Sequence, residues 1–426
     1  MMNDYAFEMA TSNLRFGAGA TREIGMDLAD LGIKRAMVLT DPNLRTLPPV
    51  ERVLESLDHQ GITYSVFDQV RVEPTDTSLR KAIEFAKSEP FEAFVAVGGG
   101  STIDTAKVAN LYSCFPPTEF LDYVNAPVGK GLPVPGGLKP LFAIPTTAGT
   151  GSETTGVAIF DLEELHAKTG IAHRRLKPIL GIVDSENTRT LPPMVAASTG
   201  LDVLTHAIES YTAIPFDRRP LPERPVLRPA YQGSNPVSDI WSLQATRMVS
   251  QYLVRAVEDP ADNEARSMMA LAASFAGVGF GNAGVTIPHG MSYPVSGMVR
   301  NYRPEGYPKD HSLVPHGMAV VLNAPAAFRF MATSCPERYL QVAEALGADT
   351  SRTRLQDAGK VVADRVIDLM KRLHIPNGLS AIGYTRADIP RLVEGTLPQH
   401  RVIKLSPRPA GAEELAAIFE DALIYW

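Results

Sequence analysis

Residues 94–107 read FVAVGGGSTIDTAK and carry the clearest indication of the fold. This stretch begins with a short apolar run typical of a buried strand, and residues 102–113 have the pattern of a following helix. The turn between them contains Gly98, Gly99, Gly100 and Ser101. Glycines let a backbone approach a diphosphate closely, and a helix start offers free N–H groups. The stretch therefore predicts a nucleotide-binding turn. The alternative is a tight turn without a ligand, since the GxGxxG pattern is absent.

The segments around this turn alternate between strand-like and helix-like patterns. We expect strands at 35–41, 62–70, 91–101, 139–147 and 178–186, and helices at 47–61, 76–90 and 102–113. Such alternation is typical of βαβ units and a mostly parallel sheet. After about residue 190 the remaining periodic segments all have helical spacing. The sequence thus predicts an α/β dinucleotide-binding domain at 1–193 and an all-helical metal-binding and substrate domain at 194–426.

Two further features favour a nucleotide over an empty turn. Asp41 ends the strand predicted at 35–41, where a carboxylate can accept hydrogen bonds from a ribose and repel a 2′-phosphate, which favours NAD over NADP. A second turn, PTTAGTGSE at 145–153, follows another predicted strand. Its hydroxyls can contact a nucleotide, and an ordinary polar loop is the alternative; they belong to Thr146, Thr147, Thr150 and Ser152.

The segment TGLDVLTHAIESY, residues 199–211, predicts a different kind of site. Asp202, His206 and Glu209 lie at offsets of four and three residues, so they share one face of a helix that is otherwise apolar. Burying such groups without partners is costly. A divalent cation bound by Asp202 and His206 resolves this conflict, and Glu209 suits a partner that orients an imidazole.

Two downstream motifs offer the remaining metal ligands. IPHGMSYP and LVPHGMAVV contain His289 and His316, each followed directly by Gly-Met. One carboxylate and three imidazoles form a mixed donor set that suits Fe²⁺ or Zn²⁺. His311 is a rival ligand that spacing alone does not exclude, and any single histidine is more often structural.

Composition limits the classes of protein. The chain has 426 residues, 45% hydrophobic and 21% charged, which is ordinary for a globular protein. A net charge of −6 without Lys/Arg runs argues against nucleic-acid binding, and no apolar run of about 18 residues predicts a membrane span. Two cysteines fit a reducing compartment, and the N-terminal residues show no signal or transit pattern. We therefore expect a cytoplasmic protein.

The motifs VGGGSTIDTAK, PTTAGTGSE, TGLDVLTHAIESY and the two HGM segments together resemble the iron-containing (group III) alcohol dehydrogenases. The resemblance spans nearly the whole chain. It implies a dehydroquinate synthase-like fold with the active site in a cleft, the metal ligands Asp202, His206, His289 and His316, and a homodimer. It also implies that Asp104 and Lys168 point toward the nucleotide.

Several departures from the common family pattern are similar to its hydroxyacid-oxoacid transhydrogenase branch. HGMSY stands where HGMAH is usual, so Tyr293 replaces a histidine, and inserts occur at 215–239 and 298–312. That branch implies NAD-dependent hydride transfer from 4-hydroxybutyrate to 2-oxoglutarate, giving succinate semialdehyde and 2-hydroxyglutarate. The substrates are then small hydroxyacids and oxoacids. Tyr293 and His311 are the candidates for relaying the alcohol proton.

The inserts also suggest how an acidic substrate is held. A carboxylate needs a cationic anchor, and arginine offers a bidentate one. The alternative is that these are solvated basic loops. The candidates are Arg218, Arg219, Arg224, Arg228, Arg300, Arg303 and Lys309.

Three other functions compete with the transhydrogenase. An NAD-dependent dehydrogenase for 4-hydroxybutyrate or another primary alcohol shares every motif. A lyase of the dehydroquinate synthase type shares the two-domain design, but HGMSYP and GLDVLTHAIE argue against it. A non-enzymatic helical metal-binding protein would leave the nucleotide motifs without a role.

Overall fold

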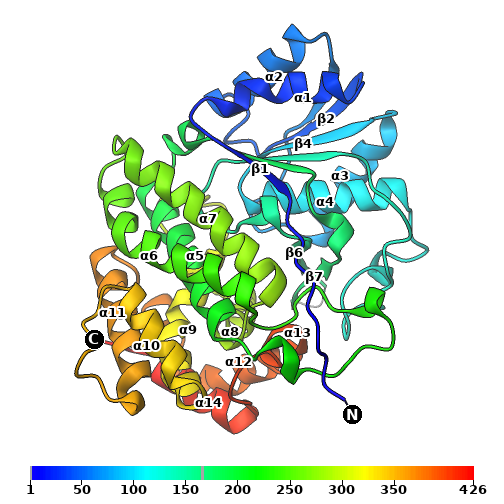
Figure 1. Ribbon diagram of the computed structural model, residues 1–426. Helices are drawn as coiled ribbons and strands as arrows, with labels where there is room; N and C mark the ends of the chain where they lie inside the picture. The colour runs from blue at the N-terminus through cyan, green and yellow to red at the C-terminus, as the bar shows by residue number, and fades with distance from the viewer. Residues whose placement is uncertain (1, 165–166) are drawn as a thin grey trace. The chain divides into compact units, whose positions relative to one another are not determined.

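The computed structural model describes residues 2–164 and 167–426. The chain divides into two compact units, one formed by Ala10–Leu191 and the other by Pro192–Trp426 together with the residues up to Met9. The first is an α/β unit and the second is helical (Figure 1). The predicted fold class is therefore confirmed.

The α/β unit is built on a six-stranded parallel sheet with the strand order β1-β8-β5-β4-β2-β3. Two further strands, β6 and β7, form an antiparallel pair. The bounds of the strands are β1 Asn13–Phe16, β2 Arg35–Leu39, β3 Thr63–Phe67, β4 Ala93–Gly98, β5 Leu141–Pro145, β6 Val157–Leu162, β7 Ala167–Ala172 and β8 Leu180–Val183.

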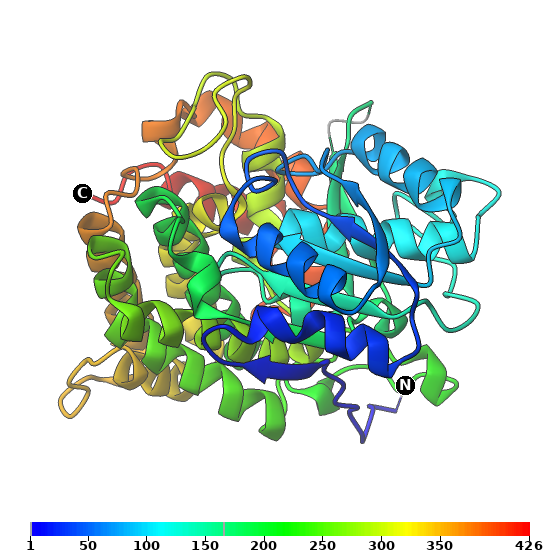
Figure 2. The same ribbon diagram turned by 90° about the horizontal axis from the view of Figure 1, so that it is seen from above.

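Two helices cover each face of this sheet. Apolar side chains of α1 (Ile24–Asp30) and α2 (Pro48–His59) pack on one face with Val38 and Val95. Side chains of α3 (Asp76–Ser88) and α4 (Gly100–Cys114) pack on the other face with Phe94. Strands buried on both faces read as continuous apolar runs, as residues 93–97 do. Figure 2 shows α1 and α2, in shades of blue, side by side along the sheet.

The helical unit is organised around α5 (Pro193–Thr212), which packs against α6, α7 and α9. Pro193 occupies the first turn of α5, where its missing N–H costs nothing. From Gly200 to Thr212 every residue of this helix is buried. The other helices are α6 Pro236–Glu258, α7 Asn263–Ala283, α8 Ile287–Gly297, α9 His316–Met331, α10 Pro336–Ala345, α11 Ala358–Arg372, α12 Ile389–Thr396, α13 His400–Ile403 and α14 Ala412–Asp421.

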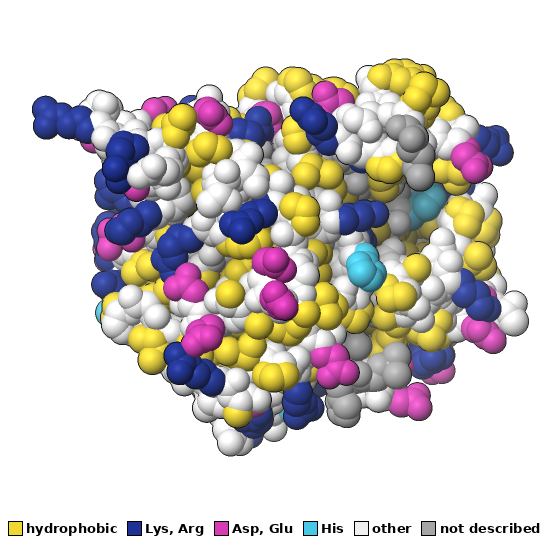
Figure 3. All heavy atoms as spheres, turned by 90° about the horizontal axis from the view of Figure 1, so that it is seen from below, with side chains coloured by type: hydrophobic (Ala, Val, Ile, Leu, Met, Phe, Trp, Pro, Cys, Tyr) yellow, Lys and Arg dark blue, Asp and Glu magenta, His cyan; other side chains and the backbone are white. Residues whose placement is uncertain are grey.

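The distribution of charge on the surface and the length and composition of the helices can be compared with what the sequence predicts. On the face shown in Figure 3, Lys and Arg side chains are interspersed with Asp and Glu, and neither sign forms a continuous field. Among the described residues no single helix is long and apolar enough to cross a membrane. Only α7 and α8 taken together, as a pair bent by 104°, meet that criterion of length and composition.

Candidate metal centre and nucleotide-binding turns

The predicted nucleotide residues meet at the carboxyl ends of neighbouring strands. In the sheet, β3 lies on one side of β2, and the next strand along the chain, β4, lies on the other side. The order of the strands therefore reverses between β2 and β4. Leu39 pairs with Ala96 near the ends of these two strands. Asp41 follows β2 and the Gly98–Gly100 turn follows β4, so both lie at the reversal point. Parallel α/β sheets bind their ligands in this position.

Gly99 and Gly100 are needed because the two predicted turns lie against each other, and Gly98 is needed because Thr102 of its own turn lies beside it. A Cβ on Gly99 would lie 3.2 Å from Cγ2 of Thr147, and a Cβ on Gly100 would lie 2.6 Å from Cγ2 of Thr150. A Cβ on Gly98 would collide with Oγ1 of Thr102 at 2.3 Å. The backbone N–H of Thr146 also donates to the Gly98 carbonyl at 3.1 Å. The turn after β4 and the turn after β5 therefore form one joined structure at the start of α4.

A fully buried lysine that the sequence pattern does not single out holds the two turns together. The Lys107 ammonium donates to Oγ of Ser152 at 2.5 Å and to the Val157 carbonyl at 2.7 Å, and it lies 3.3 Å from Oδ1 of Asp104. Burial lowers the pKa of Lys107, and the nearby Asp104 carboxylate opposes that shift. The only sign of this lysine in the sequence is its place one turn after Asp104.

Asp104 and Lys168, which resemblance directs toward the nucleotide, both have partners inside the protein. The Asp104 carboxylate accepts hydrogen bonds from Oγ of Ser152 at 2.6 Å and from the Ile159 N–H at 2.9 Å. Lys168 is buried and pairs with Glu73 at 2.6 Å and with Asp161 at 3.3 Å. Ser101 in turn accepts a hydrogen bond from the Glu73 N–H at 3.2 Å. Asp104 and Lys168 therefore also stabilise the two turns through contacts inside the protein.

Asp41 gives the first testable prediction. Its Oδ1 accepts the N–H groups of Asn43 at 2.9 Å and Leu44 at 3.3 Å, so the side chain also stabilises its own turn. Asp41→Asn keeps that acceptor and removes the charge, whereas Asp41→Gly removes both. Because the charge repels a 2′-phosphate, both variants should lose about tenfold or more in the preference for NADH over NADPH. Fluorescence titration with each cofactor measures this. An unchanged preference in both variants would remove Asp41 from cofactor selection.

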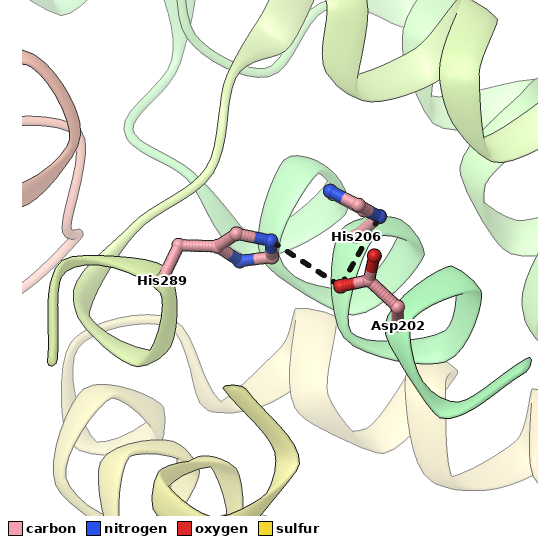
Figure 4. A group of neighbouring side chains, drawn as sticks. All are labelled: Asp202, His206 and His289. Atoms are coloured by element: carbon pink, nitrogen blue, oxygen red, sulfur yellow. Dashed lines mark ion pairs between the residues drawn. The ribbon is translucent and has the colours of Figure 1, made fainter. Parts of the chain in front are cut away.

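The predicted metal ligands from α5 and α8 meet in the interior of the helical unit. Asp202 and His206 lie one turn apart on α5, and His289 comes from α8 to face them (Figure 4). Oδ1 of Asp202 is 3.7 Å from Nδ1 of His206 and 3.7 Å from Nε2 of His289. One ligand atom from each residue lies within 4.8 Å of the other two. This spacing suits three donors around one cation.

The chemistry of these three atoms tests whether a metal fits. All three side chains are buried, and Oδ1 of Asp202, Nδ1 of His206 and Nε2 of His289 have no hydrogen-bond partner in the part of the chain that the structure describes. A buried carboxylate oxygen and two buried ring nitrogens without partners are costly. A divalent cation would satisfy all three at once, and the mixed N/O set is one that Fe²⁺ and Zn²⁺ accept.

Close packing brings His316 to the same place. His316 is the first residue of α9, and its ring centroid lies 5.4 Å from that of His289. A Cβ on the next residue, Gly317, would lie 2.2 Å from the Ser198 carbonyl oxygen and 2.7 Å from Cβ of Asp202. The glycine of this HGM motif is thus required for α9 to approach α5 closely enough to place His316 beside Asp202.

Two neighbours fix the orientation of the ligand rings. The His206 ring stacks on Phe280 of α7 with ring centroids 3.9 Å apart. Oε1 of the fully buried Glu209 lies 2.5 Å from Nδ1 of His289, and its other oxygen accepts from the N–H of Thr286 at 2.6 Å. Glu209 therefore orients His289 so that Nε2 faces Asp202.

The surroundings also set the charges of the ligands. Burial raises the pKa of Asp202, but the facing imidazoles outweigh it and hold that pKa below its usual value. Burial lowers the pKa of His206 to about 3. For His289 burial also lowers the pKa, but the Glu209 and Asp202 carboxylates outweigh it and raise the pKa to about 9. Asp202 is thus ready to bind a cation at pH 7, and His206 is neutral, whereas His289 would release a proton when a metal binds.

Glu209 gives a second prediction. Glu209→Gln keeps the size of the side chain but removes the charge that holds His289 in place. Metal affinity should fall about 10- to 100-fold, the range found when such orienting groups are lost. Equilibrium titration in chelator-buffered metal solutions measures it, with the exposed Glu258→Gln on α6 as a matched control. Wild-type affinity in Glu209→Gln would show that His289 is oriented without it.

The two proposed proton-relay residues have different surroundings. Tyr293, one turn after His289 on α8, is buried, and its ring stacks on His316 with centroids 6.3 Å apart. Its hydroxyl accepts a hydrogen bond from Nη2 of Arg401 at 3.1 Å. The His311 side chain is 30% exposed, and Nδ1 lies 2.8 Å from Oδ1 of Asp310. Geometry places Tyr293 beside the metal ligands and gives His311 an exposed acidic neighbour.

Comparisons with known proteins agree with this geometry. The family model for iron-containing alcohol dehydrogenase matches residues 11–185, and the model for the C-terminal part of the same family matches residues 230–423. The chain belongs to the iron-containing alcohol dehydrogenase family. Within the family it is 59% identical over 421 residues to the hydroxyacid-oxoacid transhydrogenase of Bos taurus, covering 99% of this chain and 90% of that protein.

Solved structures of the family share the whole fold. A 1,3-propanediol oxidoreductase is 28% identical with a TM-score of 0.85, covering 98% of this chain and 100% of that one. A sulfoacetaldehyde reductase from Bifidobacterium kashiwanohense, solved in complex with NAD⁺, is 27% identical with a TM-score of 0.79, covering 99% of both chains. The family, the branch and the oxidoreductase class predicted from the motifs are therefore confirmed.

One expectation is wrong. The bovine relative is named as a mitochondrial protein, which overturns the prediction of a cytoplasmic location. That prediction depended on ordinary globular composition, on two cysteines and on N-terminal residues without a signal or transit pattern. The composition and the cysteine count fit any reducing compartment equally well.

Proposed function

We propose that this chain is a hydroxyacid-oxoacid transhydrogenase that uses NAD and Fe²⁺. It oxidises 4-hydroxybutyrate to succinate semialdehyde and reduces 2-oxoglutarate to 2-hydroxyglutarate, so a hydride is passed from one acid to the other, one proton is released and one is taken up, and no cofactor is consumed. The observation that carries the proposal is the buried Asp202–His206–His289 group, whose three facing atoms lack partners within the described residues. It occurs in a chain 59% identical to a named transhydrogenase.

The residues of this chain would divide the work as follows. When bound, a divalent cation supplies a Lewis acid for a substrate oxygen, and a nicotinamide supplies the hydride carrier. We assign the cation to Asp202, His206, His289 and His316. The nucleotide is assigned to the joined turns at Gly98–Ser101 and Thr146–Thr150, with its ribose near Asp41. Zn²⁺ fits the same metal ligands, and we propose Fe²⁺ from the family.

Tyr293 is assigned the proton of the substrate hydroxyl. Its phenol lies between the His316 ring and the Arg401 guanidinium. The contact with Arg401 fixes the position of the phenolic oxygen, from which the hydroxyl can pass a proton to or from a substrate oxygen.

The proposal is tested by incubating the pure holoenzyme with 4-hydroxybutyrate and 2-oxoglutarate without added NAD. Steady formation of 2-hydroxyglutarate, at a rate that added NAD does not raise, supports the transhydrogenase. The second candidate is an NAD-dependent alcohol dehydrogenase, which the fold shared with a 1,3-propanediol oxidoreductase favours. Turnover that begins only when NAD is supplied, and continues without an oxoacid, would decide for that candidate.

The partners in this proposal are small hydroxyacids and oxoacids, without nucleic acid or membrane, and a second copy of the chain. One chain has a mass of 46.1 kDa. Light scattering should therefore give twice this value for the homodimer, and a mass of one chain would contradict it.

A further inference from the structure

The substrates of the proposed function share one feature besides the reacting carbon. In 4-hydroxybutyrate and succinate semialdehyde, two methylene groups separate the reacting carbon from a carboxylate. In 2-oxoglutarate and 2-hydroxyglutarate, two methylene groups likewise separate the reacting carbon from the distal carboxylate. A single cationic group at a fixed distance from the metal would therefore serve both half-reactions. A bidentate arginine meets this need best.

The basic residues of the two inserts are engaged elsewhere or exposed. Arg219 and Arg228 both bind the buried Asp4, at 2.6 and 2.9 Å. Arg300 pairs with Asp388, and Lys309 donates to backbone carbonyls of its own loop. The side chains of Arg218, Arg224 and Arg303 lie at the exposed surface. The three paired arginines therefore stabilise the helical unit through ion pairs. None of the contacts described for the basic residues of the inserts is with a metal ligand.

A different arginine, Arg401, contacts Tyr293, whose ring stacks on His316. Arg401 belongs to the short helix α13, which packs against α8, the helix that carries His289 and Tyr293. Gly290 permits this packing, because a Cβ there would already lie 3.0 Å from Ile403. The guanidinium donates from Nη2 to the Tyr293 hydroxyl at 3.1 Å, and its Cζ lies 4.9 Å from the centre of the Tyr231 ring.

The second terminal nitrogen of this guanidinium, Nη1, is buried and has no hydrogen-bond acceptor among the described residues. The side chains that contact the guanidinium are the phenols of Tyr231 and Tyr293, and no carboxylate pairs with it in the part of the chain that the structure describes. A buried cationic donor without a partner is costly. A carboxylate from a bound ligand would satisfy it.

We propose that Arg401 is the anchor for the carboxylate that 4-hydroxybutyrate and 2-oxoglutarate have in common, and that it sets the preference for a two-methylene spacing. Tyr293 contacts this guanidinium through its hydroxyl and the His316 ring through its own ring, so a carboxylate at Arg401 would lie one side chain away from the metal ligands. Arg401 is thus a specificity-determining residue. The inference rests on the proposed function.

The test measures binding and turnover in the metal- and NAD-loaded enzyme. Succinate, an unreactive acid of the same length, is the calorimetric probe. Arg401→Gln should weaken succinate binding about 10- to 100-fold, because a charge-assisted contact is lost. The KM for both 4-hydroxybutyrate and 2-oxoglutarate should rise similarly, with kcat changed much less. Arg401→Lys keeps the charge without the bidentate fork and should lie between the wild type and Arg401→Gln.

Controls separate this inference from the function beneath it. Arg391→Gln removes an exposed guanidinium from α12, which also packs on α8, and should leave succinate affinity unchanged. An active wild-type enzyme whose Arg401→Gln and Arg401→Lys variants bind succinate normally would overturn the anchor alone. A wild-type enzyme that converts neither acid would overturn the proposed function. If Arg401→Gln does not fold, unchanged succinate affinity in Arg401→Lys still contradicts bidentate anchoring.

Discussion

His206→Ala is expected to lose its metal and to slow turnover roughly 1,000-fold or more, because a Lewis acid contributes several kcal/mol to such a reaction. The substitution removes one of the three buried atoms that have no other partner in the described protein, and it leaves Asp202 with only His289 and His316 beside it. Metal content after dialysis and steady-state kinetics measure the two effects.

The matched control is His59→Ala, which removes an exposed histidine at the end of α2. It should retain metal and activity. The circular dichroism spectrum of His206→Ala should match that of the metal-free wild type, which separates a lost ligand from a lost fold. Full activity in a metal-free preparation of His206→Ala would show that His206 does not bind a metal needed for the reaction.

The second large effect is expected from Lys107→Met. The methionine fits the buried volume but leaves the Val157 carbonyl and Asp104 without their cation. Removing one member of a buried ion pair costs about 3–5 kcal/mol of unfolding free energy. For a unit of this size that corresponds to a melting temperature lowered by roughly 6–20 °C. The affinity for NADH should fall as well, because the two nucleotide turns lose their connection.

Scanning calorimetry measures the change in stability, with Lys81→Met on the exposed side of α3 as the control. The control should melt within about 2 °C of the wild type, since surface substitutions change stability little. If Lys107→Met melted like the control, the lysine would have no structural role between the turns.

The α/β unit could be predicted because its central strands are buried on both faces and its turns are marked by glycine. The runs at 93–97 and 141–144 have no other reading in an alternating chain. The hairpin of β6 and β7 was not predicted. Its strands are held by pairing with each other and by contacts with α3 and α4, which local sequence does not reveal.

The helical unit was predicted as a class, but the helices that carry half of the metal site were not. Pro294 lies inside α8 and Pro325 lies inside α9. A proline removes a helical hydrogen bond and usually marks a break. Tertiary packing, with Gly317 against α5, overrides that local preference. The HGM motifs therefore indicate that His289 and His316 are ligands, but they do not indicate the helices that carry these residues.

The candidate site shows the same division between local and long-range information. Asp202, His206 and Glu209 could be predicted because they are four and three residues apart, a spacing that places them on one face of a single helix. Arg401 could not, since it lies more than a hundred residues beyond Tyr293 and only the packing of α13 on α8 joins them. The inserts are rich in arginine, yet Asp4 pairs with Arg219 and Arg228, and Asp388 pairs with the exposed Arg300.

One hydride is expected to pass between two acids on a cofactor that stays with the protein. The most direct measurement supplies 4-hydroxybutyrate deuterated at C4, unlabelled 2-oxoglutarate and an excess of unlabelled free NADH, and follows the label by mass spectrometry. We predict deuterium at C2 of 2-hydroxyglutarate, undiluted by the free NADH. Unlabelled 2-hydroxyglutarate, with the deuterium recovered in the NADH pool, would contradict the account.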